Sequence, residues 1–262
     1  MRARHETLAR DIALIHAHRF QAVYGCRRMF AQLQRQGRQG IGRAQVLHVM
    51  RSLGIRGVRR GGIPVTTRPA GSTGGREDLV QRCFHADAPG HLHVADITYV
   101  RLANGSFAYV AFVTDAYARR IVGWAVSTGR RTRQLPLIAL DQSISWTARH
   151  GDTRGLIHHA DHGTQYISTI YGTRLDEHGI LASTGSVGDS CAFALAETAD
   201  GAYKTELIHR SKPFDSAHAL EQVTFPWVSW WNQERLHETL GYQTPAEVEA
   251  RYHQSQVAPV TQ

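Results

Sequence analysis

The sequence predicts an α/β protein in which a mixed sheet is flanked by helices and preceded by a small all-α unit. Residues 3–53 show only the apolar spacing of helices, whereas residues 91–127 consist of three runs rich in Val, Ile, Tyr and Phe. After those runs, helical and strand patterns alternate, which is typical of helices packed on a mixed sheet. The 262 residues, 42% of them hydrophobic, are enough for one large core and a smaller unit.

Three helices are expected near the N-terminus, because apolar residues recur at helical spacing over residues 3–20, 24–36 and 46–53. Gly37 and Gly40 end the second helix and provide a tight turn before the third. Two short helices joined in this way predict a helix-turn-helix. The alternative is an ordinary αα-hairpin, and the arginine content of the segment favours the helix-turn-helix.

The charge of the chain is divided unevenly along its length. Residues 1–76 contain 15 Arg, no Lys and two acidic residues, a balance of +13, whereas residues 77–262 have a balance of −5. A basic unit of this kind neutralises backbone phosphates, which predicts DNA as the partner and a salt-sensitive affinity. We expect Arg27, Arg28 and Arg43 to contact DNA. The alternative is a solvated arginine-rich face.

Residues 56–78 are rich in Gly, Pro, Thr and Arg and lack periodicity, which predicts a basic linker. The chain is accordingly expected to divide into four parts. These are a helix-turn-helix-like DNA-binding segment (1–55), the linker (56–78), a core (79–212) and a C-terminal helical segment that packs on the core (213–262).

The cellular location is expected to be a reducing cytoplasm. The three cysteines are widely scattered, so neither a disulfide framework nor a thiolate zinc site is predicted. No stretch approaches the ~18 consecutive apolar residues that a membrane span needs. We therefore expect no membrane contact.

The predicted sheet begins with three antiparallel strands, at 91–100, 107–117 and 119–127, the first two joined by an Asn104-Gly105 turn. Beyond them the patterns predict, in order, a helix (132–148), a strand (155–161), a helix (168–178), a strand (179–183) and a helix (190–208). The segment 216–237 is also helical in pattern, and Pro226 is expected to end or kink it.

Three carboxylates stand out by their position. Asp96 lies within an apolar strand, where a charge needs a reason to be, and Asp161 ends a second short strand. The two approach each other if those strands are neighbours, and Glu197 projects from a helix that can pack beside them. Three carboxylates make an oxygen-ligand site suited to Mg²⁺ or Mn²⁺. Two such ions can promote in-line phosphoryl displacement.

Several motifs resemble one known family. The strings VADITYV, HHADHGTQYIS and GDSCAFALAETADGAYKTELI resemble the catalytic core of bacterial insertion-sequence transposases, the Asp-Asp-Glu recombinases related to retroviral integrases. YGCRRMFAQL resembles the helix-turn-helix segment of that family, and WNQERLHETLGYQTPAE resembles its C-terminal signature. The order of these motifs and the 35 residues between Asp161 and Glu197 make the resemblance far more specific than any single acidic residue.

The resemblance implies an RNase H-like, five-stranded integrase core and an active transposase. Asp96, Asp161 and Glu197 would be the catalytic residues and the ligands of two Mg²⁺ or Mn²⁺ ions. The reaction would hydrolyse a DNA strand at an element end and direct its 3′-hydroxyl at target DNA. Lys204 matches a basic residue that grips the terminal phosphates, and its alternative is a solvated lysine paired with Asp200.

The partners that the resemblance implies are the DNA of the element ends and of the target. A homo-oligomer assembled on that DNA is also implied. The chain would be the second-reading-frame (OrfB-like) subunit of the transposase. It would work with, or be fused to, an upstream-frame (OrfA-like) partner.

Two departures from the family pattern leave other functions open. Ala192-Phe193 replaces an Asp-Asn pair, and Phe193, one helical turn before Glu197, would remove a polar contact. His93 stands where relatives show a larger aromatic residue or Gln. A catalytically decayed, DNA-binding remnant is therefore one alternative. A nuclease of related fold that only hydrolyses DNA is another, although Lys204 and the basic unit argue against it.

A histidine cluster and a tryptophan cluster suggest a metal site and a base-stacking site, neither of which we favour. His158 and His159 are adjacent in a strand and should point to opposite faces, so a zinc site with His162 is not favoured. Either His159 or His162 is a possible DNA contact. Trp227, Trp230 and Trp231 are more typical of a core or an interface than of base stacking.

Overall fold

The computed structural model describes residues 2–58, 77–81, 83–129, 134–161, 166, 168–185 and 194–257. The helices are α1 (Arg2–Ala17), α2 (Cys26–Arg35), α3 (Arg43–Ser52), α4 (Leu135–His150), α5 (Thr169–Glu177), α6 (Ala194–Glu206), α7 (Ala217–Gln233) and α8 (Pro245–Val257). The strands are β1 (Leu92–Arg101), β2 (Phe107–Asp115), β3 (Ile121–Thr128), β4 (Ile157–Ala160) and β5 (Leu181–Thr184). Within these described ranges, no helix has the length and apolar character that a membrane crossing requires.

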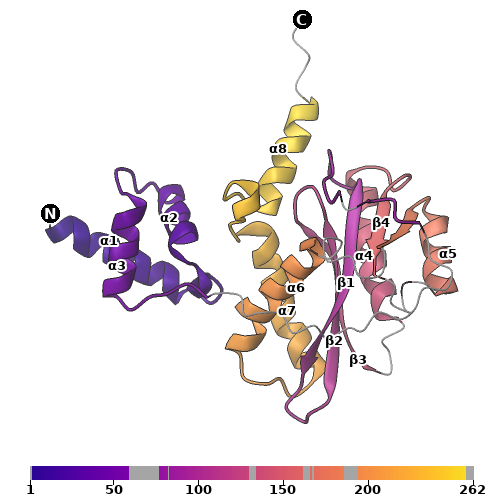
Figure 1. The fold of residues 1–262 in the computed structure, drawn as a ribbon, viewed down its shortest axis with the longest axis horizontal. Helices are drawn as coiled ribbons and strands as arrows, with labels where there is room; N and C mark the ends of the chain where they lie inside the picture. Colours follow the sequence, from indigo (N-terminus) through magenta and orange to yellow (C-terminus); the bar gives the residue numbers. More distant parts are fainter. Residues whose placement is uncertain are drawn as a thin grey trace, which may run out of the picture.

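The five strands form one mixed sheet in the order β3-β2-β1-β4-β5. β1 pairs antiparallel with β2, and β2 with β3, whereas β4 lies parallel to both β1 and β5. The predicted mixed sheet is therefore confirmed. β4 pairs only with residues 92–95 of β1, so the second half of β1 extends beyond it as part of a long hairpin with β2 (Figure 1).

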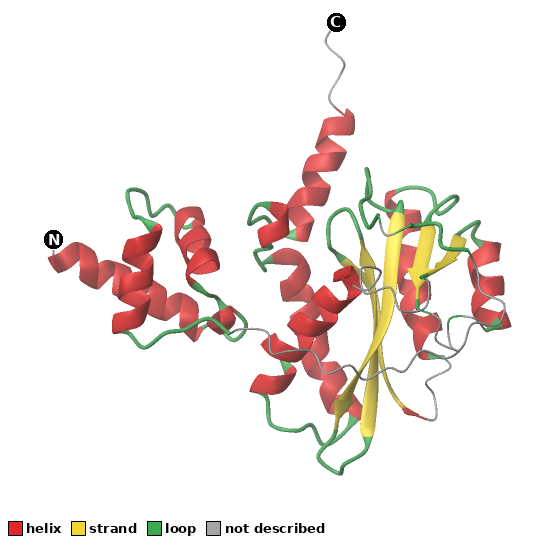
Figure 2. Ribbon diagram, in the orientation of Figure 1, coloured by secondary structure: helices red, strands yellow, loops and turns green. Residues whose placement is uncertain are grey.

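Helices cover both faces of the sheet (Figure 2). Alternate residues of a strand point to opposite faces. Val100, Val110 and Phe112 accordingly join one apolar cluster with α6 and α7, whereas Ala111 and Val113 join a second cluster with α4 and α5. Both faces are buried, which explains why the strands read as nearly continuous apolar runs.

The N-terminal helices α1, α2 and α3 form the predicted all-α unit, which lies beside α7 and α8 (Figure 1). Its apolar residues belong to the same cluster as those of α6 and α7. The Phe20 ring packs 5.3 Å from that of Trp230, and the Tyr24 hydroxyl accepts a hydrogen bond from the Leu236 backbone N–H at 3.1 Å. The unit is thus joined to the body by a shared apolar core.

A buried ion pair lies at this junction. Arg235, just after α7, donates two hydrogen bonds to Glu206 at the end of α6, from Nε at 2.9 Å and from Nη2 at 2.6 Å. The two side chains are only 3% and 6% exposed. The guanidinium also lies 4.3 Å from the centre of the Trp231 ring, and Arg28 of α2 reaches the same carboxylate. One glutamate therefore connects α6, the C-terminal segment and the N-terminal unit.

Helix α7 excludes one of the two outcomes expected at Pro226, namely that the helix ends there. Pro226 lies inside the helix. The three tryptophans that follow are fully buried, which confirms that they belong to the core. Trp231 also donates its indole N–H to the Arg119 carbonyl at 2.9 Å. Tertiary packing of these rings stabilises a helix that the local sequence disfavours.

Helix α8 is held on the body by a second buried carboxylate. Glu249 accepts a hydrogen bond from Arg120 Nη1 at 2.7 Å, and Tyr252 packs 5.4 Å from Tyr117. Burial raises the pKa of Glu249 from 4.5 to about 7, and the nearby Asp115 carboxylate adds to this while Arg120 opposes it. Burial likewise raises the pKa of Asp115 to about 6.

Replacing Arg235 with Met should lower the free energy of unfolding by about 3 to 5 kcal/mol, because it leaves the Glu206 charge buried without its main partner. Arg27 provides the control, since its pair with Glu238 is more than half exposed. Arg27→Ala should cost less than about 1 kcal/mol. Urea titration of both variants measures the difference. Equal losses would contradict the assigned role of the buried pair.

Replacing Glu249 with Gln should change how stability depends on pH. The folded protein holds the Glu249 proton up to about pH 7, whereas the unfolded chain loses it near 4.5, so the glutamate stabilises the fold less as the pH rises through this window. Glutamine cannot ionise. The free energy of unfolding should therefore shift in favour of the variant as pH rises, by on the order of 1 kcal/mol or more. Melting temperatures measured across the window follow this change. A difference independent of pH would contradict this.

Candidate active site

Two of the predicted carboxylates lie side by side in the sheet. The parallel register pairs Ala95 of β1 with Ala160 of β4. Asp96 and Asp161 are the next residues of the two strands and thus lie at the same level. Neighbouring strands are about 4.8 Å apart. The condition that the sequence left open, that these strands be neighbours, is met.

Helix α6 lies on the face of the sheet toward which Asp96 points. Asp96 and Val100 are four residues apart in β1 and so point to the same face of the sheet. Val100 packs in the apolar cluster that contains α6 and α7. α6 contacts both β1 and β2. Glu197 lies in the first turn of this helix, and its side chain is outside the described part of the structure. The backbone arrangement therefore brings the helix of the third carboxylate to the face of the first.

The pKa of the buried Tyr166 hydroxyl is affected by the charges of this site. Its side chain is 2% exposed and packs edge-on against Tyr171, with ring centres 5.4 Å apart. Burial, then Tyr171, and then the negative charges of Asp96, Asp161 and Asp200 raise the pKa of Tyr166 well above 10. The phenol is therefore neutral at physiological pH. All three carboxylates act electrostatically on this one hydroxyl group.

Sequence reasoning missed Tyr166 and the location of Asp200. Asp200 is buried and lies three residues after Glu197, on the same side of α6. The three-residue spacing from Glu197 could have indicated that Asp200 lies near the site. A solvated surface position is, however, the simpler prediction for an aspartate in a polar helix. Tyr166 lies five residues after Asp161, inside the family motif, and no local pattern distinguishes it from a core tyrosine.

The carboxylate oxygens suit a hard divalent cation. Among the side chains that the structure describes, which do not include Glu197, no three His, Cys, Asp or Glu residues are placed to hold a metal. The fit therefore rests on the Asp96 and Asp161 pair, which supplies oxygen ligands from adjacent strands at one level of the sheet. Asp96 Oδ1 also accepts the Ile97 backbone N–H at 2.7 Å, which helps to orient the carboxylate.

The neighbouring histidines point to opposite faces of β4, as predicted. His158 Nε2 lies 2.7 Å from the Tyr171 hydroxyl, whereas His159 Nδ1 lies 2.9 Å from Ser183 Oγ. Both rings are buried, so His159 is not exposed to DNA. His162 lies outside the described residues. His93 is fully buried beside Asp115, and burial lowers the pKa of His93 to about 3, so this residue is a neutral part of the core.

Lys204 lies on the same helix as Glu197, two turns further along. Its ammonium group is 5.0 Å from the centre of the Tyr99 ring of β1. Tyr99 is partly exposed, so the lysine lies at the edge of the site beside an aromatic surface. Neither of the two roles considered from the sequence, a phosphate contact and a pair with Asp200, anticipated this aromatic neighbour.

The three arginines expected to contact DNA have different environments. Arg43 begins α3 and is exposed. Arg27 is also exposed but pairs with Glu238 at 2.6 Å. Arg28 is only 25% exposed, and its Nη1 donates to Glu206 at 3.3 Å. In this arrangement Arg28 serves the junction between the units, whereas Arg27 and Arg43 are both exposed.

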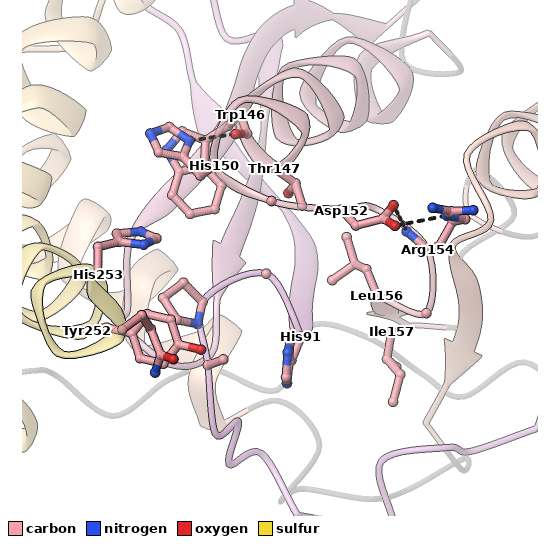
Figure 3. Close-up of a pocket in the computed structure, with 16 residues that line it drawn as sticks. His91, Trp146, Thr147, His150, Asp152, Arg154, Leu156, Ile157, Tyr252 and His253 are labelled. Carbon is pink, nitrogen blue, oxygen red and sulfur yellow. Dashed lines mark hydrogen bonds and ion pairs between the residues drawn. The ribbon is translucent and has the colours of Figure 1, made fainter. Parts of the chain in front are cut away.

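A cavity of about 590 Å³ lies at the opposite end of the sheet from the carboxylates (Figure 3). It is lined by residues that precede β1 and β4 and by α4 and α8, including Trp146, His150 and His253. Asp96 and Asp161 do not line it. The cavity is therefore separate from the candidate active site.

Comparisons with known families agree with the motifs. The family model described as "Integrase core domain" matches residues 86–190, and a second model with the same description matches residues 178–245. The model described as "HTH-like domain" matches residues 3–62. Together with the observed sheet, these matches confirm the predicted RNase H-like integrase core and its N-terminal helix-turn-helix unit.

Individual relatives cover nearly the whole chain. A Mycobacterium tuberculosis protein named as a transposase for insertion sequence element IS986/IS6110 is 44% identical to this chain. The match covers 96% of this chain and 90% of the relative's own length. The transposase of insertion sequence element IS629 from Shigella sonnei is 44% identical over 89% of this chain and 76% of its own length.

Among solved structures, the HTLV-2 integrase catalytic core domain in complex with magnesium aligns with a TM-score of 0.45 and 14% identity, over 63% of this chain and 99% of its own. The family models follow one another along residues 3–245, and two relatives at 44% identity cover at least 89% of the sequence. The chain therefore belongs to the insertion-sequence transposases with a retroviral-integrase-type core, among their second-reading-frame (OrfB-like) members.

Proposed function

We propose that this protein is a transposase that cleaves a DNA strand at the ends of its insertion sequence and transfers the freed 3′-hydroxyl to target DNA. The observation that carries the proposal is the register of β1 and β4, which puts Asp96 and Asp161 at one level of adjacent strands. With Glu197 on α6, they would form the catalytic Asp-Asp-Glu centre. Membership of the transposase family supports this assignment.

The chemistry follows from what these residues can hold. Asp96 and Asp161 would bind Mg²⁺ or Mn²⁺ from the sheet, and Glu197 would bind it from α6. Two such ions, when bound, stabilise the attacking and leaving oxygens of phosphoryl transfer. The carboxylates also keep the region negatively charged, which favours cations over other ligands. Tyr166, a neutral phenol, adds no charge of its own to this centre.

The DNA would be held by residues on both units of the protein. Lys204, on the helix of Glu197, would contact a phosphate near the reacting bond. Arg43 is exposed on the N-terminal unit, where it can neutralise backbone phosphate. Arg27 and Arg28 would contribute only by exchanging their glutamate partners for phosphates. We expect a homo-oligomer on DNA, with an upstream-frame partner or fusion, at the nucleoid.

A second candidate function is DNA binding without catalysis. Ala192-Phe193 replaces the polar pair of the family motif just before Glu197; both residues lie outside the described part of the structure. A hydrolysis-only nuclease is the remaining alternative. Labelled element-end DNA with Mg²⁺ or Mn²⁺ distinguishes the three, with and without the upstream-frame protein. Strand transfer identifies the transposase, cleavage alone identifies the nuclease, and retardation without products identifies the DNA-binding remnant.

Replacing Asp96 with Asn should reduce both cleavage and strand transfer to background while leaving DNA affinity within about twofold, because it removes a metal ligand and adds no steric change. Asp152→Asn is the matched control. Asp152 is exposed, pairs with Arg154 and lines the remote cavity. Persistent products from Asp96→Asn, or equal losses in the control, would show that the site is misassigned.

Restoring the family residue at position 193 tests the departure directly. Phe193→Asn should increase the rate of strand transfer if the missing polar group limits catalysis, since residues that support metal ligands commonly change activity by about 10- to 100-fold. Initial rates on one DNA substrate measure this effect. An unchanged rate in an active enzyme would show that Phe193 is compatible with full turnover.

A further inference from the structure

Two aromatic side chains are exposed on the long hairpin of β1 and β2. Tyr99 is 39% exposed and Phe107 is 44% exposed. Their ring centres are 5.4 Å apart and their planes are nearly perpendicular, at 89°. Neither residue belongs to the apolar clusters of the protein. Both lie in the part of the hairpin that extends beyond β4, so β4 does not cover them.

Cations lie next to this aromatic pair. The Lys204 ammonium is 5.0 Å from the centre of the Tyr99 ring. Arg101 is exposed and lies opposite Phe107 in the hairpin. Its side chain points to the same face of the sheet as that of Tyr99. One surface of the hairpin therefore combines exposed ring faces with positive charge. A surface with both features suits a single-stranded nucleic acid, whose bases stack and whose phosphates are negatively charged.

The surface lies on the same strand as Asp96 of the candidate active site. Tyr99 follows Asp96 by three residues of one strand, which is about 10 Å at 3.3 Å per residue. Residues three apart in a strand point to opposite faces of the sheet, so Tyr99 and Asp96 lie on opposite faces. β4 does not cover this part of β1, so a DNA strand bound at Asp96 would reach the aromatic pair by passing around this edge of the sheet. Lys204 comes from the helix of Glu197 and links the two places.

We propose that Tyr99 and Phe107 form a stacking site for an unpaired base of the DNA, and that Lys204 binds the adjacent phosphate. The inference rests on the proposed function, because the ligand is the DNA on which the carboxylates act. An unpaired base exposes both ring faces, whereas a base in a duplex is already stacked on its neighbours. The site therefore favours DNA with an opened or single-stranded end over a fully paired duplex.

The competing explanation is that the pair only stabilises the hairpin. Cross-strand aromatic pairs do contribute to sheet stability. In that case, removing either ring lowers the melting temperature but affects paired and unpaired DNA equally. A preference for an unpaired end that depends on these rings distinguishes the two explanations. It can be measured without catalysis, in EDTA.

The experiment compares the affinity of the full chain for a blunt duplex and for the same duplex with a short unpaired end, by fluorescence anisotropy in EDTA. Wild type should bind the unpaired end more tightly. Tyr99→Ala and Phe107→Ala should each weaken binding of that DNA about 5-fold or more, and change binding of the blunt duplex less than about twofold. Phe107→Trp should retain the preference, since it keeps an aromatic surface.

Two further variants complete the test. Phe225 is an aromatic residue of α7 that is 65% exposed and packs against Trp124 of β3, not against Tyr99 or Phe107, so Phe225→Ala should leave both affinities unchanged. Lys204→Gln should weaken binding of both DNAs and reduce the dependence on salt by about one phosphate contact. Loss of the preference in Phe225→Ala, or its persistence in Tyr99→Ala and Phe107→Ala, would overturn the proposal.

Failure of the proposed function gives a different result. If the protein shows the ring-dependent preference but no strand transfer, the stacking site stands and the transposase activity does not. If it transfers strands but shows no ring-dependent preference, the stacking site is wrong and the catalytic assignment stands. A 2-aminopurine base in the unpaired end adds a direct signal, since stacking on a ring quenches its fluorescence in wild type but not in Phe107→Ala.

Discussion

The buried pair of Arg235 and Glu206 is the interaction on which most of this structure depends. Two nearly inaccessible charges must satisfy each other, because an unpaired charge in that environment is strongly destabilising. The pair fixes the end of α6 against the segment that follows α7. α6 carries both Glu197 and Lys204, so the same contact holds the helix that serves the site. Arg28 extends the pair to the N-terminal unit.

The site itself depends on the parallel register of β1 and β4. A shift of one residue would turn Asp161 to the opposite face of the sheet, away from Asp96. Adjacent carboxylates repel each other without a cation, so this register is retained at some cost in stability. The cost is limited because both carboxylates are only half-buried, whereas the apolar residues around them fill both faces of the sheet.

The charge distribution has a structural counterpart. The basic N-terminal unit meets the acidic body through Arg27 with Glu238, Arg28 with Glu206 and Arg35 with Glu247. Glutamate carboxylates occupy positions that phosphates would take if these arginines bound DNA. Part of the positive charge of the unit is thus neutralised within the protein. Other positive charges remain open to solvent, among them the exposed Arg43, and Lys204 lies beside the partly exposed Tyr99.

Local sequence patterns were enough to predict the order of the helices and strands, the mixed sheet and the candidate acidic residues. These features are encoded locally, in apolar spacing, in turn residues and in motifs of a few residues. The sequence also placed the tryptophans in the core, but it predicted that α7 ends or kinks at Pro226. The helix continues because three buried rings stabilise it through contacts that no local propensity includes.

Which distant side chains meet is visible only in the folded chain. It showed that β1 and β4 are neighbours, that Tyr166 and Asp200 lie near the aspartates, and that Arg28 binds a glutamate 178 residues away. It also placed the Lys204 ammonium beside the Tyr99 ring. Periodicity states which face of an element is apolar but not which element covers it. Those partners follow from the packing of the whole chain, because each contact joins segments whose local patterns are independent.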